Sequence, residues 1–369
     1  MLTGGIMVRS IYVKNFKCFE NISVECRELN LFTGINGMGK STIIQALLLL
    51  RQTYERVMPG RENNALLNGK YVSLGTLKDI SYWYKTDDEI CISVKEDSDS
   101  FECRYDSDKD ALLLSNRIIH LEPEIMGGAG FEYISAERLG PRRYYDDLER
   151  EGYSSSQVGI KGEHTISSLY ILGSDLQVYK NMKHDREESS TLELQVNAWM
   201  SEISPGIKVK AVPYLDANMM GLRYAKQSRM GEESANAVNM GYGVSYVLPV
   251  VVALLKARKG DLLIIENPEA HLHPKGQRQI GELAAKAAAN GVQIIMETHS
   301  DHVLNGVRLA VKQGKIQSGK VGIHYFGVYE EDGIWKHEKT SPEILEDGSL
   351  TNWPEGFFDE WDKAIDLLF

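Results

Sequence analysis

The first third of the chain changes from a strand pattern to a helix pattern and back again. Residues 11–26 (IYVKNFKCFENISVEC) alternate apolar and polar positions, and the apolar run 29–34 (LNLFTG) predicts a buried strand. Residues 41–57 (STIIQALLLLRQTYERV) have helical spacing without Gly or Pro, which predicts a helix. Residues 80–114 place charged turns between short apolar runs and predict a strand meander. These segments predict an N-terminal antiparallel β-subdomain.

The middle of the chain is less regular. Residues 144–162 are polar and rich in Asp, Glu, Arg, Ser and Gly. Helical spacing returns at about 163–172 and 191–203, and two later runs, IKVKAVPYL and GLRYAKQ, predict a strand pair. We therefore expect a helical and irregular insertion at about residues 144–205.

The last third alternates helices with apolar strands. The expected helices are 244–258, 275–289 and 301–313, and the expected strands are 261–266, 292–297 and 320–328. Alternation with apolar strands implies the α/β class, in which a mainly parallel sheet is flanked by helices. The sequence carries no sustained heptads, and we expect a C-terminal extension from about residue 320 to residue 369.

Composition narrows the class of protein. The 369 residues are 43% hydrophobic and 25% charged with a net charge of −11, which is typical of a globular protein and does not indicate nonspecific binding to nucleic acid. The four cysteines form no CxxC pair and no Cys/His metal spacing, which favours a reduced protein. The first residues lack the long apolar core of a signal peptide, so we expect none. The most apolar segment, Val244–Leu255, is too short to span a membrane. We expect a soluble, cytoplasmic protein without a membrane partner.

A phosphate-binding pattern follows the second predicted strand. GINGMGKST, from Gly34 to Thr42, matches G-x-x-x-x-G-K-[ST] between a strand and a helix, which is the context the pattern requires. Its N–H groups would curl around phosphate oxygens, Lys40 would reach the β- and γ-phosphates, and Ser41 would coordinate Mg²⁺. The alternative is an ordinary glycine-rich turn. We expect ATP and Mg²⁺ here, bound by Asn36, Gly37, Gly39, Lys40, Ser41 and Thr42.

The run LLIIENPEAHLHP, residues 262–274, predicts the acid of the same site. Glu266 ends its strand and would bind Mg²⁺, unless it is a solvated loop residue. The next residue, Asn267, stands where many ATPases carry Glu, and its amide can hold a water but cannot accept its proton. Either Glu266 serves both roles or Glu269 is the base. We expect a displaced base and slow hydrolysis.

Histidines near these strand ends are further candidates. In IIMETHS, Glu297 ends a strand, and the His299 ring would donate a hydrogen bond to a γ-phosphate or serve as a surface or capping residue. His271 and His273 have an HxH spacing that suits zinc. No Cys or third His lies near them in the sequence, so we expect no metal at this pair.

Four motifs in order, GINGMGKST, NMGYGVSYVLP, LLIIENPEAHLHP and IIMETHS, resemble those of ABC/SMC-like ATPases, in particular bacterial AAA-type ATPases related to OLD-family proteins. In that class they are Walker A, the signature motif, Walker B with the D-loop, and the H-loop. YISAERLGPRRYY (133–145) and WPEGFFDE (353–360) resemble motifs of one subfamily, the second in a C-terminal domain of unknown function. The resemblance implies a single P-loop ATPase head over residues 1–369.

The resemblance also implies a partner. Members of the class are ATPase subunits of anti-phage and toxin-like systems, often beside a separate nuclease. OLD nucleases add a Toprim domain and SMC proteins insert long coiled coils, and this sequence shows neither. We expect an ATP-dependent homodimer that controls an effector such as a nuclease or toxin in anti-phage defence. The alternatives are a DNA-binding repair-type ATPase and a stand-alone P-loop nuclease or kinase.

The signature motif has two interpretations. Gly241, Gly243 and Ser245 supply the glycines and the hydroxyl that would contact a γ-phosphate across a dimer. The spacing is not LSGGQ, and a glycine-rich turn that caps the next helix explains the same residues.

The charges of ERLGPRR also have two interpretations. They are solvated, as most such runs are, or they form a switch or a partner surface. The residues concerned are Glu137, Arg138, Arg142 and Arg143.

Overall fold

The fold comes from a computed structural model that describes residues 7–57, 66–96, 100–106, 111–113, 130–146, 157–228, 231–331, 333–354 and 356–368. The chain divides into two compact units. The first unit is Met1–Phe131 with Gly319–Leu345 and Leu350–Phe369, and the second is Glu132–Ser318 with Glu346–Ser349. The irregular segment expected at 144–162 lies partly outside the described residues. The boundaries expected at about 144–205 and 320–369 stay predictions.

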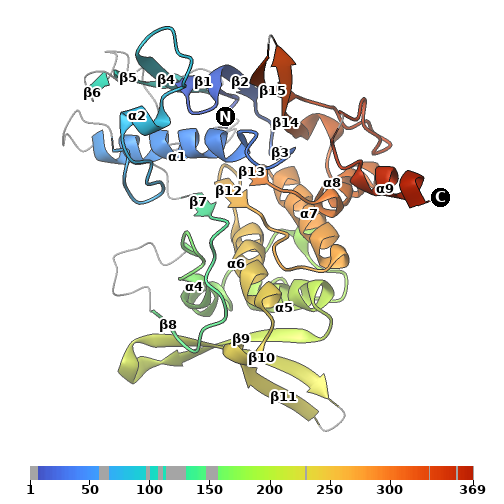
Figure 1. Ribbon diagram of the computed structural model, residues 1–369. Helices are drawn as coiled ribbons and strands as arrows, with labels where there is room; N and C mark the ends of the chain where they lie inside the picture. The colour runs from blue at the N-terminus through green and yellow to red at the C-terminus, as the bar shows by residue number, and fades with distance from the viewer. Residues whose placement is uncertain are drawn as a thin grey trace, which may run out of the picture. The chain divides into compact units, whose positions relative to one another are not determined.

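An antiparallel sheet occupies the N-terminal part of the first unit, as the alternating pattern predicts. Its strands lie in the order β2-β1-β4-β5-β6. Their bounds are β1 Ser10–Phe16, β2 Phe19–Glu25, β4 Glu89–Lys95, β5 Ser100–Asp106 and β6 Ala111–Leu113. Alternate side chains of β1 are buried, and α1 (Lys40–Val57) packs against β1 and β4 (Figure 1). The core of this part lies between the helix and the sheet.

The predicted meander begins later than expected. Residues 77–80 form a single helical turn, α2 (Leu77–Ile80), in which Thr76 and Asp79 make a capping box. The two side chains satisfy N–H groups that a helix leaves without partners at its start. The residues between this turn and β4, 81–88, form turns and a loop and not a strand.

A parallel strand pair completes the sheet structure of the first unit. β3 (Leu29–Gly34) pairs in parallel with β14 (Val321–Glu331), which pairs antiparallel with β15 (Ile334–Thr340). The sequence predicted β3 and β14 because they are apolar, but not the largely polar β15. A last helix, α9 (Glu360–Leu368), was also not predicted.

The second unit contains the alternating helices and strands that the sequence predicted. β12 (Leu262–Glu266) and β13 (Gln293–Glu297) are parallel, and β7 (Phe131–Ile134) lies beside β12. Every side chain of β13 and all but the last of β12 are buried, as in sheets covered on both faces. The helices are α6 Tyr242–Lys256, α7 Pro274–Ala289 and α8 Asp301–Lys312.

Two glycines let α7 and α8 pack side by side (Figure 1). A Cβ on Gly281 would lie 2.1 Å from the Val303 carbonyl oxygen, and a Cβ on Gly306 would lie 2.1 Å from that of Arg278. Neither position can hold a side chain without moving the backbone of the other helix. The close contact fixes the helices that follow β12 and β13.

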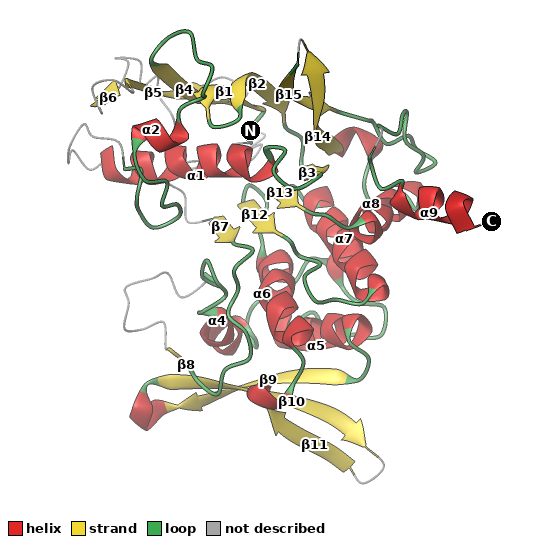
Figure 2. Ribbon diagram, in the orientation of Figure 1, coloured by secondary structure: helices red, strands yellow, loops and turns green. Residues whose placement is uncertain are grey.

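A second antiparallel sheet belongs to the same unit. Figure 2 shows β9, β10 and β11 as a layer with α4 and α5 on one side. The bounds are β8 Tyr145–Asp146, β9 Ile207–Tyr214, β10 Met219–Ser228, β11 Gly231–Asn236, α4 Thr165–Leu172 and α5 Leu192–Ile203. The predicted strand pair is confirmed as β9 and β10, whereas β11 was not predicted.

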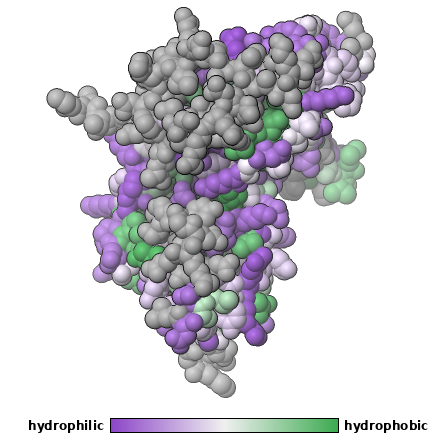
Figure 3. All heavy atoms as spheres, turned by 90° about the vertical axis from the view of Figure 1, so that its left-hand side faces the viewer, coloured by the Kyte–Doolittle hydropathy of each residue, from purple (hydrophilic) through white to green (hydrophobic). Residues whose placement is uncertain are grey.

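Short 3-10 turns connect several of these elements. They are Lys180–Met182, Leu215–Ala217, Ala237–Asn239 and Ser318–Lys320. On the face drawn in Figure 3, the coloured atoms are mostly hydrophilic, with small separate hydrophobic groups. Within the described ranges, none of the helices has the length and apolar character that a membrane crossing requires.

Candidate functional site

The loop between β3 and α1 has the backbone that phosphate binding requires. Gly34, Gly37 and Gly39 have φ angles of 131°, 80° and 100°, which glycine adopts without strain. A Cβ on Gly34 would lie 2.1 Å from the Phe326 carbonyl oxygen, and one on Gly39 would lie 2.3 Å from the Phe19 ring. The three glycines therefore serve backbone geometry and close packing, and residues 35–37 at the tip of the loop are exposed.

The Lys40 side chain forms hydrogen bonds with the backbone of this loop. Its side chain is buried, and its Nζ donates to the carbonyl oxygens of Gly34 at 2.9 Å and Ile35 at 2.7 Å. The Thr42 N–H donates to the Gly39 carbonyl oxygen at 3.1 Å, so the turn runs directly into α1. An ammonium held in this position can exchange carbonyl acceptors for phosphate oxygens, which are stronger acceptors.

The C-terminal extension touches the same loop, a contact that sequence reasoning did not predict. A Cβ on Gly356 would lie 2.7 Å from the Tyr325 hydroxyl and 3.7 Å from Cδ1 of Ile35, which is 55% exposed. The buried ring of Phe357 packs on Tyr325 at 5.4 Å and on Trp353 at 5.1 Å between centroids. The aromatic residues of WPEGFF thus anchor the extension beside the phosphate loop.

Glu266 lies at the end of β12 in the second unit. Its Oε2 accepts a hydrogen bond from the Ala136 N–H at 2.9 Å, in the loop that follows β7. Burial raises the pKa of the Glu266 carboxyl, although the Ala136 N–H, the Tyr133 hydroxyl and Arg138 act in the opposite direction. The carboxyl is therefore fixed in direction and can bind a cation that compensates its burial.

Arg138 is buried, so the interpretation of this residue as a solvated charge is wrong. Its guanidinium donates to the carbonyl oxygens of Glu266 at 2.7 Å and Asn267 at 2.5 Å. It also lies 5.5 Å from the ring centroid of Tyr246 on α6. Burial lowers the pKa of Arg138 to about 10. The residue ties the strand end to the helix that starts at the expected signature motif.

The other charges of ERLGPRR remain at the surface. Glu137 is exposed and pairs with Lys161 at 2.9 Å, and the side chains of Arg142 and Arg143 are exposed. Their role as a partner surface stays a prediction.

Asn267 occupies a backbone conformation that explains its residue type. Its φ is 45°, in the left-handed region, and its N–H donates to the Glu297 carbonyl oxygen at 2.9 Å. Asn enters this region more easily than most residues because its short side chain bonds locally. The turn after β12 thus favours Asn where many ATPases carry Glu.

Glu269 joins the two strand ends. Its Oε2 accepts from the Thr298 hydroxyl at 2.9 Å, and its Oε1 accepts from the His299 N–H at 2.7 Å. Burial raises the pKa of the Glu269 carboxyl, and these donors partly oppose the rise. The structure therefore brings Glu269 to the backbone of His299, while the His299 side chain itself is exposed.

The expected signature residues divide into two groups. Gly241 is the exposed N-cap of α6, and a Cβ there would meet no atom within 4 Å. A Cβ on Gly243, in contrast, would lie 2.4 Å from the His271 carbonyl oxygen. Ser245 is buried, with its hydroxyl 3.1 Å from that of Tyr224. Ser245 is therefore not the exposed hydroxyl that the sequence predicted, because its position on the helix faces the core.

The histidines of the HxH pair have structural contacts. The His271 ring lies 5.0 Å from the Tyr246 ring, and the His273 side chain is the N-cap of α7, where it accepts from the Lys275 N–H at 3.4 Å. These contacts orient the first residues of α7.

The residues fit ATP and Mg²⁺ by their chemistry. The phosphate loop offers an exposed tip at residues 35–37 and an ammonium, and the Ser41 hydroxyl and the Glu266 carboxylate are the hard oxygen ligands that Mg²⁺ prefers. The two residues belong to different units. Among the described residues, no group of three or more His, Cys, Asp or Glu side chains forms another metal site.

Comparisons with protein families agree with these features. A family model described as "AAA domain, putative AbiEii toxin, Type IV TA system" matches residues 29–305. A second, described as "Protein of unknown function (DUF3696)", matches residues 316–368. The first match contains both strand ends and the phosphate loop, and the second contains the WPEGFF contacts.

Individual relatives place the chain in the same class. It is 24% identical to an OLD nuclease of Thermus scotoductus (strain ATCC 700910 / SA-01) over 335 residues, which cover 80% of this chain and 59% of the nuclease. The chain thus spans less than two thirds of the length of that relative. The expected resemblance to OLD-related ATPases is confirmed.

Solved structures show the fold. An Smc head bound to the C-winged helix domain of ScpA has a TM-score of 0.51 at 13% identity, covering 90% of this chain and 97% of the other. An Smc head domain with an extended coiled coil, bound to the C-terminal domain of ScpA derived from Pyrococcus furiosus, has a TM-score of 0.50 at 12% identity, covering 98% of each. The predicted fold, a P-loop NTPase of the ABC/SMC-head type, is confirmed.

Proposed function

The chain belongs to the AAA-domain family whose model matches residues 29–305, and on this premise we propose that it binds ATP with Mg²⁺ and hydrolyses ATP slowly. The loop from Gly34 to Lys40 carries the proposal. Its three glycines have positive φ, residues 35–37 at its tip are exposed, and one buried ammonium lies at its carbonyl oxygens. Such loops bind phosphates through their N–H groups and a lysine.

The residues of the loop and of the β12 end have separate roles in this proposal. Lys40 would leave its carbonyl acceptors and donate to the β- and γ-phosphates, because ionised acceptors form stronger hydrogen bonds. Ser41 and Glu266 would hold Mg²⁺, which supplies positive charge where phosphoryl transfer develops negative charge. The Ala136 N–H would keep the Glu266 carboxylate in one direction.

We assign the general base to Glu269. Its raised pKa makes the carboxylate a stronger base than an ordinary Glu, and its two donors fix both oxygens while lone pairs remain for a water. Asn267 cannot take a proton, and its backbone serves the turn. The exposed His299 ring would donate to the γ-phosphate. A site with a displaced base is expected to be slow.

We also propose that two copies close on ATP. The start of α6, a helix of 15 residues with an exposed glycine at its N-cap, offers free N–H groups to an anion. In the dimer this helix end, without Ser245, would contact the nucleotide bound by the other copy. The closed dimer would control a separately encoded effector, such as a nuclease or toxin, in anti-phage defence. Slow hydrolysis would lengthen the closed state.

Lys40→Ala tests the phosphate loop. Losing a charge-assisted contact should weaken ATP binding by about tenfold or more, as measured by equilibrium titration with a fluorescent ATP analogue. Lys78→Ala, which removes an exposed lysine on α2, is the matched control and should bind like the wild type. Undiminished affinity in Lys40→Ala would contradict the proposed ATP site.

Native mass with and without Mg-ATP, followed by nuclease and kinase assays on the same sample, distinguishes the switch from the alternatives. A dimer that forms with ATP, turns over slowly and cuts no DNA supports the switch. Fast turnover by a strict monomer contradicts it. Turnover that DNA stimulates would favour a repair-type ATPase.

A further inference from the structure

We propose that Gln277 on α7 is a positioning residue for Glu269 and acts on it through Ser300 and Thr298. The inference rests on the proposed role of Glu269 as the base, in the turn that follows β12. Thr298 and Ser300 belong to the turn that follows β13, and α7 lies between the two turns in the sequence. A ring of hydrogen bonds joins the two turns, and the donors in this ring have fixed directions.

The Gln277 side chain bridges the two turns. Its Nε2 donates to the Leu272 carbonyl oxygen at 2.8 Å, and its Oε1 accepts from the Ser300 hydroxyl at 2.5 Å. A carbonyl oxygen can only accept, so the amide nitrogen has to face Leu272 and the amide oxygen has to face Ser300. The single hydroxyl proton of Ser300 therefore points to Gln277.

Ser300 transmits this direction to Thr298. Its hydroxyl oxygen accepts from the Val303 N–H at 3.1 Å, as the N-cap of α8, and its N–H donates to the Thr298 hydroxyl oxygen at 3.1 Å. The Thr298 side chain is buried. Because its oxygen receives the Ser300 N–H, its own proton is directed to Oε2 of Glu269, which lies 2.9 Å away.

The ring closes on the turn that carries Glu269. The Leu272 N–H donates to the Glu269 carbonyl oxygen at 3.0 Å, and the His299 N–H donates to the second carboxylate oxygen at 2.7 Å. Burial raises the pKa of Glu269, and the donors from Thr298 and His299 and the charge of Arg138 oppose the rise. The His299 ring itself is exposed. Each carboxylate oxygen keeps a lone pair, and the direction of both lone pairs is set by the ring.

The position of α7 therefore determines the direction of the Glu269 carboxylate. Gln277 lies in the first turn of α7, and Ser300 caps α8, which packs against α7 through Gly281 and Gly306. A general base needs both distance and angle toward its water, and a displacement of about 1 Å can cost about a hundredfold in rate. Opening the ring should lower kcat and leave ATP binding intact, because none of its side chains belongs to the phosphate loop.

Gln277→Met and Thr298→Val open the ring at two points. Each should lower kcat by about tenfold without a change in KM for ATP, and Thr298→Ser, which keeps the hydroxyl, should recover most of kcat. Removing the Thr298 donor raises the pKa of Glu269 further, so the acidic limb of the pH profile should move to higher pH in Thr298→Val. In a Glu269→Gln background, Thr298→Val should change neither kcat nor the limb.

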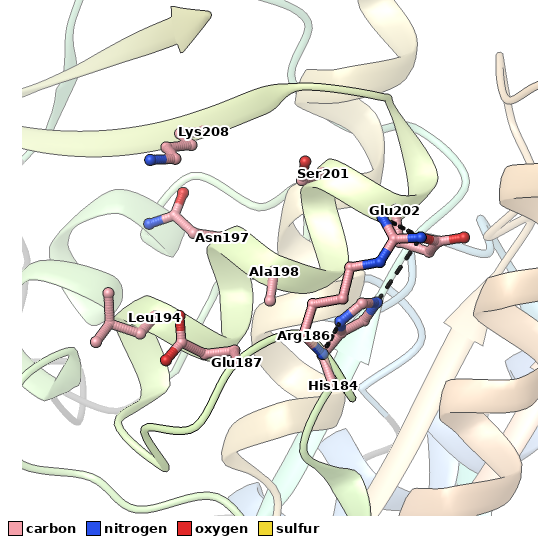
Figure 4. A pocket seen from close by; sticks show the side chains of 9 residues that line it. All are labelled: His184, Arg186, Glu187, Leu194, Asn197, Ala198, Ser201, Glu202 and Lys208. Atoms are coloured by element: carbon pink, nitrogen blue, oxygen red, sulfur yellow. Dashed lines mark hydrogen bonds and ion pairs between the residues drawn. The ribbon is translucent and has the colours of Figure 1, made fainter. Parts of the chain in front are cut away.

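Asn197→Leu is the matched control, because it removes an amide that also bridges two elements of the second unit. The Asn197 amide donates to the Glu193 carbonyl oxygen at 3.1 Å and accepts from the Val209 N–H at 2.6 Å. It lies with Lys208 on the wall of the pocket drawn in Figure 4. This variant should lower the melting temperature, as the ring variants do, and leave kcat and the pH profile unchanged.

The outcomes distinguish the ring from the base that it positions. Wild-type kcat and pH profile in Gln277→Met and Thr298→Val would overturn the positioning role, while a slow Glu269→Gln would still support the base. Equal losses of kcat in Thr298→Ser and Thr298→Val would also overturn it, since the hydroxyl would then be irrelevant. Full turnover in Glu269→Gln would contradict the proposed base and, with it, this inference.

Discussion

At the scale of single residues, Asn267 shows how a backbone angle decides which side chain a position holds. The sequence suggested an ATPase whose catalytic Glu had been replaced. The structure shows a residue with φ of 45° whose N–H bonds across to the end of β13. A left-handed conformation costs most residues about 1 kcal/mol or more, and less for Asn. The identity of this residue therefore follows from the turn, and the question of the base moves to its neighbours.

The location of the base can be tested by two substitutions. Glu269→Gln should slow ATP turnover by about a hundredfold, the usual contribution of a general base, because Gln keeps the shape and cannot accept a proton. Asn267→Ala should leave the turnover per folded molecule close to that of the wild type, although the positive φ will lower stability slightly. Steady-state ATPase assays measure both, and the reverse pattern would place the base at residue 267.

The pH profile adds an independent measurement to the same prediction. Burial raises the pKa of Glu269, so its carboxylate takes up a proton at a higher pH than an ordinary Glu. Turnover should be constant above the raised pKa and fall as the pH decreases through it. This acidic limb should become weaker in Glu269→Gln, and the part that remains should come from Glu266, whose pKa burial also raises.

The sequence did not predict that Arg138 is buried and donates to the end of β12. Arg138→Gln should lower kcat by about tenfold or more with little change in KM for ATP, because the phosphate loop is untouched while the β12 end loses its two donors. Stability should fall by about 1–3 kcal/mol, because two buried carbonyl groups lose a partner. Arg138→Lys should recover part of kcat, and the exposed Arg142→Gln is the control. Equal losses in the two Gln variants would exclude a positioning role.

At the scale of elements, the start of α6 carries two glycines, Gly241 and Gly243, whose surroundings differ. Position 243 requires glycine because a Cβ there would clash with the His271 carbonyl oxygen. A Cβ at position 241 would meet no atom within 4 Å. The sequence alone could not separate them, because the difference lies in a contact with the turn after β12. Gly241 is therefore the position at which a substitution tests whether another molecule contacts the start of α6.

Gly241→Asp should keep the fold and prevent the ATP-dependent dimer. Asp is a good N-cap and should maintain or increase stability by up to about 1 kcal/mol, but its charge repels an incoming phosphate at the helix start. Gly241→Asn is the matched control, since it caps equally well and carries no charge. Native mass with Mg-ATP reads the result. A normal dimer in the Asp variant would show that this helix end is not at the interface.

Periodicity predicted elements with strongly apolar faces and missed those without them. The helix expected at 275–289 is α7, Pro274–Ala289, and the strand expected at 292–297 is β13, Gln293–Glu297. β11 and β15 are largely polar, so only their pairing with β10 and β14 defines them. Local sequence carries no signal for such strands, because their partners lie elsewhere in the chain.

At the scale of the whole molecule, the net charge of −11 does not show how charges are distributed locally. It correctly suggested a protein that does not coat nucleic acid through a uniformly basic surface. It gave no sign that Lys315, from the segment after α8, joins Arg278 and Lys286, which flank Glu282 four residues away on either side along α7, because that contact forms only when the two segments pack. The phosphate loop, in contrast, was readable because all its parts are consecutive.

The close contact of α7 with α8 also constrains the history of the protein. Gly281 and Gly306 each fit against the backbone of the opposite helix, so neither can acquire a side chain by a single change without separating the pair. The helices follow the two turns that carry Glu269 and His299. Lineages descended from this sequence therefore inherit the spacing of the two helices as one unit.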